Sequence, residues 1–230
     1  MTNGTRLFVA DTTNNRVLIW NTIPVANQTA ANLVLGQTTF TSITANAPGI
    51  TSASLSAPSS ITSNGTQLAV SDFTNNRVLL WNTIPTVNGQ AANVVLGQAL
   101  FTTVTANSGG IGAGSISGSR GVYFDGTKLF VADSTNQRIL IWNTFPTTNF
   151  QVANETLGQF NFLSNGANMI DAKGMNLPQQ GFKDINGKLY VADTANNRVL
   201  IWYTAPINSD IPADVVLGQS LGSTNLSNNG

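Results

Sequence analysis

The sequence predicts an all-β protein built from four repeated four-stranded sheets, and three observations lead to that prediction. A motif that reads "VADTTNNRVLIWNT" in its first copy occurs four times at nearly constant spacing. An Asn-Gly or Asp-Gly dipeptide, the strongest short signal for a β-hairpin, precedes each copy. The segments that flank these turns are short and apolar, as expected for buried strands.

The repeat covers nearly the whole chain of 230 residues. Its Asp recurs after 61, 61 and 60 residues, and an Arg five positions later and a Trp nine positions later recur with it. Repeats of this kind indicate one structural unit each, here residues 1–48, 49–109, 110–170 and 171–230 of a single propeller domain or part-propeller. The repeated positions are Asp11, Arg16, Trp20, Asp72, Arg77, Trp81, Asp133, Arg138, Trp142, Asp193, Arg198 and Trp202.

Each unit is predicted to hold four short antiparallel strands, as the second unit illustrates. Its strand segments are "LSAPSSITS" (55–63), "QLAVSD" (67–72), "RVLLWN" (77–82) and "ANVVLGQ" (92–98). In the first unit, residues 7–10 and 17–20 are apolar at successive positions, so we expect both faces of these strands to be covered. Packing four-stranded sheets radially, as the blades of a β-propeller, covers both faces. A linear β-solenoid is the rival, but its coils are usually shorter and lack hairpin turns.

The first unit starts at its Asn3-Gly4 turn, so the first blade is predicted to lack its innermost strand. Such a blade exposes an unpaired strand edge, which tends to recruit another strand. We expect self-association, or completion of the ring by additional blades. The C-terminal tail "SLGSTNLSNNG" (220–230) is an alternative source of the missing strand.

The segment "LYVADTANNRVLIW" (189–202) resembles the core of the NHL repeat, a propeller-blade motif. The longer unit, with "NTIP" and "VLGQ", resembles bacterial NHL-repeat proteins that have long linkers between blades. The resemblance implies a propeller whose innermost strands line a central channel. Members of the family include binding platforms, RNA-binding proteins, zinc-dependent lyases and lactonase-like hydrolases, so the resemblance supports the fold more than any activity. The lyases bind zinc through histidine, which this chain lacks.

The composition excludes several functions. Lys+Arg and Asp+Glu both number 10, and charged residues make up only 9% of the chain, so the basic excess of a nucleic-acid binder is missing. The absence of Cys and His excludes disulfides, thiolate nucleophiles and imidazole bases. No apolar run approaches the roughly 18 residues of a membrane span. The uncharged Asn/Thr/Ser-rich composition favours an extracellular or cell-surface location.

Fourfold recurrence favours a structural joint for the Asp–Arg pair, because a catalytic site occurs once per ring. We expect the Asp to accept hydrogen bonds from the backbone of the turn that it begins, and the Trp to pack between blades. Phe40, Phe101 and Phe162 are again 61 residues apart and are expected to anchor the linkers or to contact a ligand there.

Few residues remain as candidates for chemistry. Arg120, Lys183 and Asp184 fall on or beside innermost strands and are candidate channel-facing polar groups. We predict no catalytic residue, no metal ligand and no cofactor; calcium bound by Asp and Asn oxygens stays open without a motif to support it.

The leading hypothesis is a non-enzymatic binding or scaffold module. Its Thr/Asn/Gly-rich linkers (38–54, 99–115 and 160–176) would present one face to a protein or glycan. One alternative is a lactonase-like hydrolase with an axial divalent metal. Another is a structural subunit of a bacterial surface or filamentous assembly.

Overall fold

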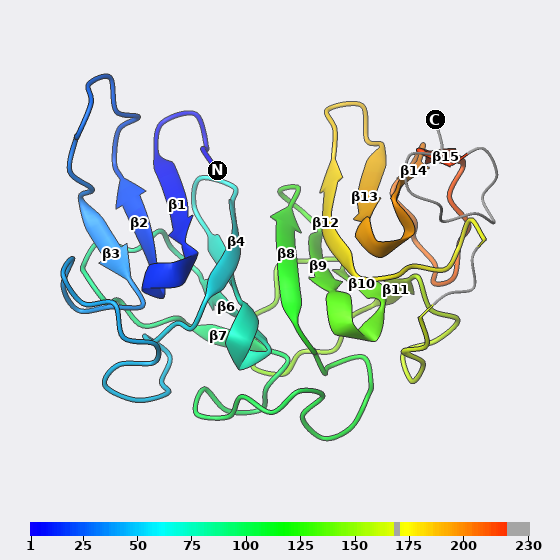
Figure 1. Ribbon diagram of the computed structural model, residues 1–230, viewed down its shortest axis with the longest axis horizontal. Coiled ribbons are helices and arrows are strands. Elements are labelled where there is room, and N and C mark those ends of the chain that lie inside the picture. Colours follow the sequence, from blue (N-terminus) through cyan, green and yellow to red (C-terminus); the bar gives the residue numbers. More distant parts are fainter. Residues whose placement is uncertain (168–170, 220–230) are drawn as a thin grey trace.

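The computed structural model describes residues 1–167 and 171–219, which form four antiparallel sheets in chain order (Figure 1). We call these sheets blades 1 to 4. Blade 1 has three strands and the others have four. In each blade the strands are hydrogen-bonded in sequence order, from the innermost to the outermost. The predicted β-propeller architecture is therefore confirmed, and among the described residues the first blade lacks its innermost strand.

The strand bounds follow the repeat closely. Blade 1 contains β1 (Leu7–Asp11), β2 (Arg16–Trp20) and β3 (Leu33–Leu35). Blade 2 contains β4 (Pro58–Ser63), β5 (Leu68–Asp72), β6 (Arg77–Trp81) and β7 (Val94–Leu96). Blade 3 contains β8 (Ser119–Phe124), β9 (Leu129–Asp133), β10 (Arg138–Trp142) and β11 (Glu155–Leu157). Blade 4 contains β12 (Pro178–Lys183), β13 (Leu189–Asp193), β14 (Arg198–Trp202) and β15 (Val215–Leu217).

A 3₁₀ turn joins the second and third strand positions of every blade: η1 (Thr12–Asn14), η2 (Phe73–Asn75), η3 (Ser134–Asn136) and η4 (Thr194–Asn196). Each turn ends on a residue in the left-handed region, at φ between 51° and 58°. Asn tolerates this region better than most residues, which explains the Asn at this position in three of the four copies, Asn15, Asn76 and Asn197. These turns are three residues long, so no helix among the described residues has the length to cross a membrane.

The innermost position of blade 1 is occupied only at one end. The backbones of Met1 and Phe8 exchange two hydrogen bonds, at 2.9 and 3.0 Å. In blade 2, Thr62 pairs with Ala69 at the equivalent position, 61 residues later. The alternative in which the tail fills this gap concerns residues 220–230, which lie outside the described residues.

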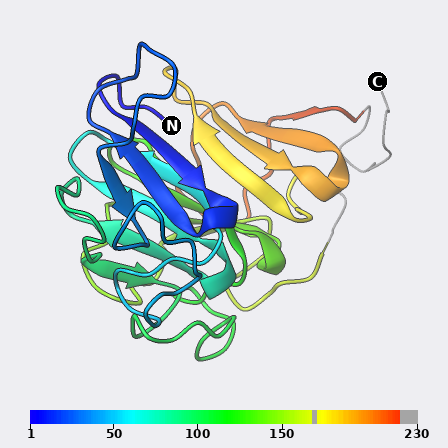
Figure 2. The ribbon, with the colours of Figure 1, turned by 60° about the vertical axis from the view of Figure 1, so that its left-hand side comes forward.

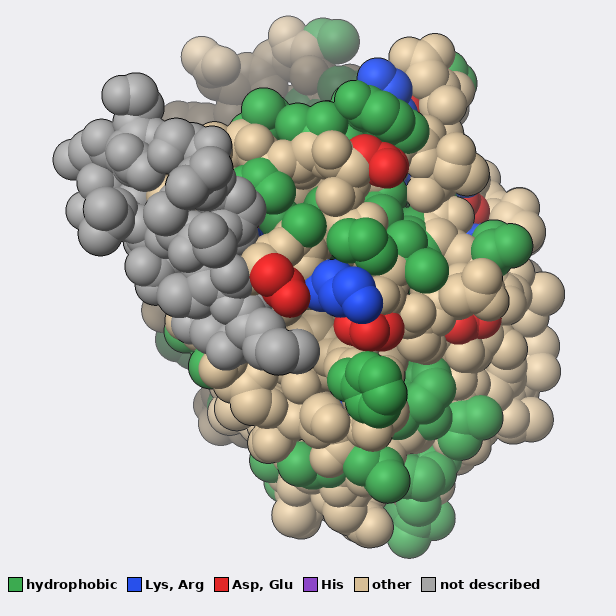
Figure 3. Space-filling view, turned by 90° about the vertical axis from the view of Figure 1, so that its right-hand side faces the viewer, with side chains coloured by type: hydrophobic (Ala, Val, Ile, Leu, Met, Phe, Trp, Pro, Cys, Tyr) green, Lys and Arg blue, Asp and Glu red, His purple; other side chains and the backbone are tan. Residues whose placement is uncertain are grey.

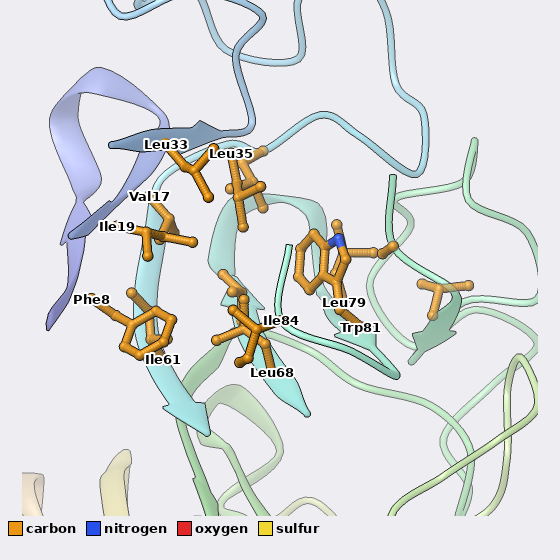
Figure 4. Packing of buried hydrophobic residues seen from close by; sticks show 14 residues of the cluster. Phe8, Val17, Ile19, Leu33, Leu35, Ile61, Leu68, Leu79, Trp81 and Ile84 are labelled. Atoms are coloured by element: carbon orange, nitrogen blue, oxygen red, sulfur yellow. The ribbon is translucent and has the colours of Figure 1, made fainter. Parts of the chain in front are cut away.

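Three hydrophobic clusters fill the spaces between consecutive blades, and none among the described residues joins blade 4 to blade 1. Figure 4 shows the first cluster, in which Phe8 and Ile19 of blade 1 face Ile61 and Leu68 of blade 2. The four sheets form an arc with blades 1 and 4 at its ends, as can be followed from blue to orange in Figures 1 and 2.

The expectation that 7–10 and 17–20 are covered on both faces is wrong for this blade. In β5 and β6 every residue is buried, whereas in β1 only Phe8 is buried and β2 alternates between buried and partly exposed residues. The physical reason is position: among the described residues, blade 1 packs against a neighbouring blade on one side only.

Candidate functional site

The Asp and Arg of each repeat are cross-strand neighbours and form an ion pair beside the 3₁₀ turn. The Arg Nε to Asp Oδ2 distance is 2.7 Å in blades 2, 3 and 4 and 2.6 Å in blade 1. Both side chains are fully buried in blades 2 to 4, whereas Arg16 and Asp11 are 16% and 23% exposed. Burial raises the pKa of Asp72 and of Asp133, against the opposing effect of the arginines.

The structure corrects one expected contact of this Asp. Its carboxylate does not accept from the backbone of the turn that follows. Instead, Asp72 Oδ1 accepts from the N–H of Ser56 at 2.7 Å, while its Oδ2 accepts from Asn75 and Arg77. The carboxylate points across the sheet toward the Arg, so it ties the segment that leads into the innermost strand to the turn.

Arg77 and Arg138 each also hold two linkers, and Arg198 donates to the carbonyl of Gly174 in the linker before blade 4. The Nη2 of Arg77 donates to the carbonyls of Thr51 and Ser54 in the linker before blade 2, at 3.1 and 2.9 Å. Its Nη1 donates to the carbonyl of Phe101 in the linker after the blade. Arg138 repeats the arrangement with the carbonyls of Gly112, Ser115 and Phe162.

Amide side chains add further attachments between linker and blade. Asn46 in the first linker and Asn75 in η2 exchange two side-chain hydrogen bonds, at 3.0 and 2.7 Å. Gln37, from the first "LGQ", donates to the carbonyls of Asn15 and Thr44. The described parts of the linkers therefore lie on the same side as the 3₁₀ turns and are held there by these hydrogen bonds, although they contain no strands (Figure 1).

The repeated Trp residues pack as expected at the ends of β6, β10 and β14. Trp81, Trp142 and Trp202 are at most 1% exposed, and each indole N–H donates to a carbonyl nine residues later. Trp20 makes the same hydrogen bond but is only partly buried.

The three repeated Phe residues differ in exposure. Phe101 and Phe162 pack against the first and second interblade clusters, and Phe40 is 39% exposed. Their neighbours are more accessible: Ile43, Leu100 and Leu163 are 53%, 60% and 73% exposed. We call the exposed side of the three linkers the linker face. The sequence argument missed these neighbours, because they do not recur at one fixed position of the repeat. A ligand-contact role for any of these residues stays a prediction.

The three predicted channel-facing residues do not come together. Arg120, near the start of β8, is exposed and places its guanidinium 4.5 Å from the ring centre of Phe73. Lys183 lies at the other end of the innermost strands, where it forms an ion pair with Asp125. Asp184 accepts from the N–H groups of Asn186 and Lys188 and from the hydroxyl of Tyr190, and is thus a turn residue.

Asp125, Lys183 and Asp184 line a hollow of about 350 Å³ together with Tyr123 and Ile185. Burial alone would raise the pKa of Asp125, but bonds from the Lys183 ammonium and from the backbone N–H groups of Lys128 and Thr127 lower it below its usual value. A larger hollow, of about 450 Å³, lies between the third linker and Asp210 of blade 4, where Lys173 pairs with Asp210 at 2.9 Å. Within the described residues, no group of three or more His, Cys, Asp or Glu is placed to hold a metal ion.

No protein-family model and no curated protein matches the chain. Solved structures do match, at low identity. The structure of U3-55K is 15% identical with a TM-score of 0.53, and the match covers 93% of this chain and 47% of that one. The RRP9 WD40 repeats are 14% identical with a TM-score of 0.54, over 97% and 50%. A putative 6-phosphogluconolactonase from Bacteroides uniformis is 13% identical with a TM-score of 0.53, over 96% and 57%.

The chain spans about half the length of these structures. At such identities the likeness concerns the fold alone, and it agrees with the radial arrangement of the sheets. The described blades thus have the β-propeller fold that WD40 and lactonase-like proteins share.

Proposed function

We propose that this protein is a non-enzymatic binding scaffold of NHL-type blades that acts outside a bacterial cell and binds a protein or glycan through its linker face. The observation that carries the proposal is the attachment of the linkers. Arg77 and Arg138 each bind the preceding linker and the following one through backbone carbonyls, so these loops are held in place before a ligand arrives. Fixed loops lose less conformational entropy on binding than flexible ones.

The side chains that the linkers expose suit recognition. Ile43, Leu100 and Leu163 offer apolar contacts to a protein, and the many Thr and Asn residues of the linkers offer hydrogen bonds to a protein or glycan. The buried Asp and Arg of the repeat bind each other in an ion pair, and their side chains in blades 2 to 4 do not reach solvent. A complete ring would give the linkers of all its blades one common face.

A binding experiment with matched variants tests the proposal. The wild-type chain is probed with a phage-displayed peptide library and a glycan array, and the dissociation constants of the selected ligands are measured. In one variant Ile43, Leu100 and Leu163 become Ser; in the control Val87, Val152 and Ile207, which are 58%, 58% and 70% exposed in loops before the outermost strands, become Ser. We expect the linker variant to bind at least tenfold more weakly and the control to bind like wild type. Unchanged affinity in the linker variant would contradict the proposal.

The hydrolase alternative is tested on the same preparations. Lactone hydrolysis is measured by proton release with Ca²⁺, Mg²⁺ or Mn²⁺ present. We expect no rate above the uncatalysed background. Metal-dependent turnover that is lost in Asp125→Asn or Asp184→Asn would favour the alternative instead.

A further inference from the structure

Consecutive blades pack by one recurring rule. We call the side of a blade that meets the preceding blade its rear face, and the other side its front face. The rear faces of blades 2, 3 and 4 carry the same series Leu, Val, Leu, Trp, and each series is buried in an interblade cluster (Figure 4). The members are Leu68, Val70, Leu79 and Trp81; Leu129, Val131, Leu140 and Trp142; and Leu189, Val191, Leu200 and Trp202.

A polar clasp accompanies every one of these apolar interfaces. The central residue of β3, Val34, donates its N–H to Asn88 Oδ1 of blade 2 at 3.1 Å. The carbonyl of Val34 accepts from the N–H of Gly89 at 2.8 Å. The loop that precedes the outermost strand of one blade thus binds the free edge of the outermost strand of the blade before it.

The clasp recurs at the other two interfaces with different side chains. Val95 of β7 is bound by Asn149 and Phe150, at 3.1 and 2.9 Å. Thr156 of β11 is bound by Ser209 and Asp210, at 3.0 and 3.2 Å. The second loop residue is left-handed each time, with φ of 61° in Gly89, 57° in Phe150 and 58° in Asp210.

Blade 1 carries one half of such an interblade contact, and no cluster of the described residues covers it. Its rear face repeats the series as Leu7, Val9, Leu18 and Trp20, but Val9 is 37% exposed where its three equivalents are fully buried. Its loop places Asn27 and Gln28, both exposed, at the positions of Asn88 and Gly89. Gln28 already has the left-handed conformation, with φ of 59°.

Blade 4 carries the other half. Tyr190, Ala192, Val199 and Leu217 of its front face stand where Phe130, Ala132, Ile139 and Leu157 of blade 3 are buried. Leu217 is 51% exposed, compared with 0% for Leu157. Figure 3 shows the side of the molecule at which blade 4 lies, where hydrophobic side chains are interspersed with Lys or Arg and Asp or Glu side chains. Val216 takes the position of Val34, and no residue within 1–167 and 171–219 binds its backbone as a clasp.

We propose that the front face of blade 4 docks on the rear face of blade 1 in a second copy of this chain, and that two copies close one ring of eight blades. Asn27 Oδ1 of one copy accepts from the N–H of Val216 in the other, and the N–H of Gln28 donates to the Val216 carbonyl. The contact is heterologous, because it joins two different surfaces, the front face of blade 4 and the rear face of blade 1. A two-fold axis relates the two copies, so the ring contains this contact twice.

Three observations select a second copy over an unrelated partner. A surface that packs on the front face of blade 4, as the blades do on one another, must carry the Leu, Val, Leu, Trp series, and the rear face of blade 1 carries it. The surface must also bring a loop with a side-chain acceptor followed by a left-handed residue, and blade 1 has that loop preformed. Finally, the four blades match about half the length of the propellers to which the chain is similar.

Light scattering after size exclusion tests the association. Wild type should have twice the 24.2 kDa mass of the chain, whereas Val9→Asp and Leu217→Asp should each be monomeric, with association at least tenfold weaker. Both residues are exposed in a single copy, so circular dichroism should report folded variants. Leu100→Asp is the control, because Leu100 is 60% exposed on a linker, and it should stay dimeric. A monomeric wild type, or a dimeric Val9→Asp variant, would overturn the proposal.

A mixing experiment tests the polarity of the contact. Val9→Asp keeps an intact front face and Leu217→Asp keeps an intact rear face, so an equimolar mixture should form a dimer through one intact contact. If the dimer formed front to front or rear to rear, one of the two variants would dimerise without the other, and that result would refute a contact between front and rear faces.

The inference deepens the proposed scaffold by naming the source of its remaining blades, and the two can fail separately. Monomeric Val9→Asp retains its linkers, and the Ser-substituted linker variant retains both end faces. If the linker variant is dimeric but binds ligands like wild type, the proposed function fails and the ring stands. If wild type binds through its linkers as a monomer, the ring fails and the function stands.

Discussion

Substituting Asp133 with Ala would remove the carboxylate of the Asp133–Arg138 ion pair in blade 3. Asp133 is fully buried and accepts from Arg138 at 2.7 Å, from the N–H of Ser117 at 2.7 Å and from the Asn136 amide at 2.8 Å. The substitution leaves the Arg138 guanidinium buried without a counter-charge, and it leaves a buried N–H without an acceptor. Arg138 would keep only its three carbonyl acceptors in the linkers.

The structure sets the size of the expected loss. A turn cap alone is worth about 1–2 kcal/mol, but removing one partner of a buried ion pair typically costs about 3–5 kcal/mol. We expect the larger range for Asp133→Ala. Asp11→Ala is the matched control, because Asp11 makes the same contact with Arg16 in a partly exposed setting. Exposed pairs contribute about 1 kcal/mol or less.

Urea unfolding followed by circular dichroism measures both variants against wild type. A third variant, Asp133→Ala with Arg138→Met, should recover part of the loss, because no charge is then left buried. Equal losses for Asp11→Ala and Asp133→Ala would refute the argument that burial sets the cost. Loss of ligand binding at unchanged stability would refute the structural role altogether.

Three further predictions concern other parts of the protein. The pKa of Asp125 is lower in the folded protein than in the unfolded chain, so its ionised carboxylate stabilises the fold at neutral pH, and this contribution is lost as pH falls through the folded pKa. In urea unfolding, the free energy of unfolding of wild type should exceed that of Asp125→Asn by about 1 kcal/mol at pH 7, and the difference should fall toward zero near pH 2. Gly97→Ala should lower stability more than Gly65→Ala: both have positive φ, but a Cβ at Gly97 would lie 2.8 Å from Asn76 O, and one at Gly65 would meet open space. EDTA should leave the melting temperature unchanged, and a clear drop would point to a bound ion.

The fold could be predicted from the sequence because its signals are local and repeated. An Asn-Gly or Asp-Gly turn marks the first hairpin of each blade, and the left-handed end of the 3₁₀ turn explains the Asn at that position in three of the four copies. Because equivalent positions lie 61 residues apart, a prediction made for one blade applies to the next. What a repeat cannot express is position: Val9 and Val70 are equivalent in sequence, yet within the described part of one chain only Val70 has a blade behind it.

The candidate site was less predictable, because its contacts join segments far apart in the chain. The Asp–Arg pair could be expected from a spacing of five residues. The bond from Ser56 N–H to Asp72, and the pairing of Lys183 with Asp125, could not, since they depend on how the innermost strands of different segments are placed. The clasps were missed for the same reason: Asn88, Asn149 and Ser209 differ in type, and their shared feature is the left-handed residue that follows.

The arginines of the Asp–Arg pairs bind the linkers in a way that allows one fold to present varied surfaces. Arg77 and Arg138 contact the linkers at carbonyl oxygens, which every residue type supplies. A linker side chain can therefore change without loss of these hydrogen bonds, provided that the backbone keeps its path. The linkers 38–54 and 99–115 already differ at many positions, yet the same Arg contacts hold the same places in both. Since the attachment depends on the backbone and the surface depends on side chains, the side chains of this face can vary at little cost to the stability of the blades.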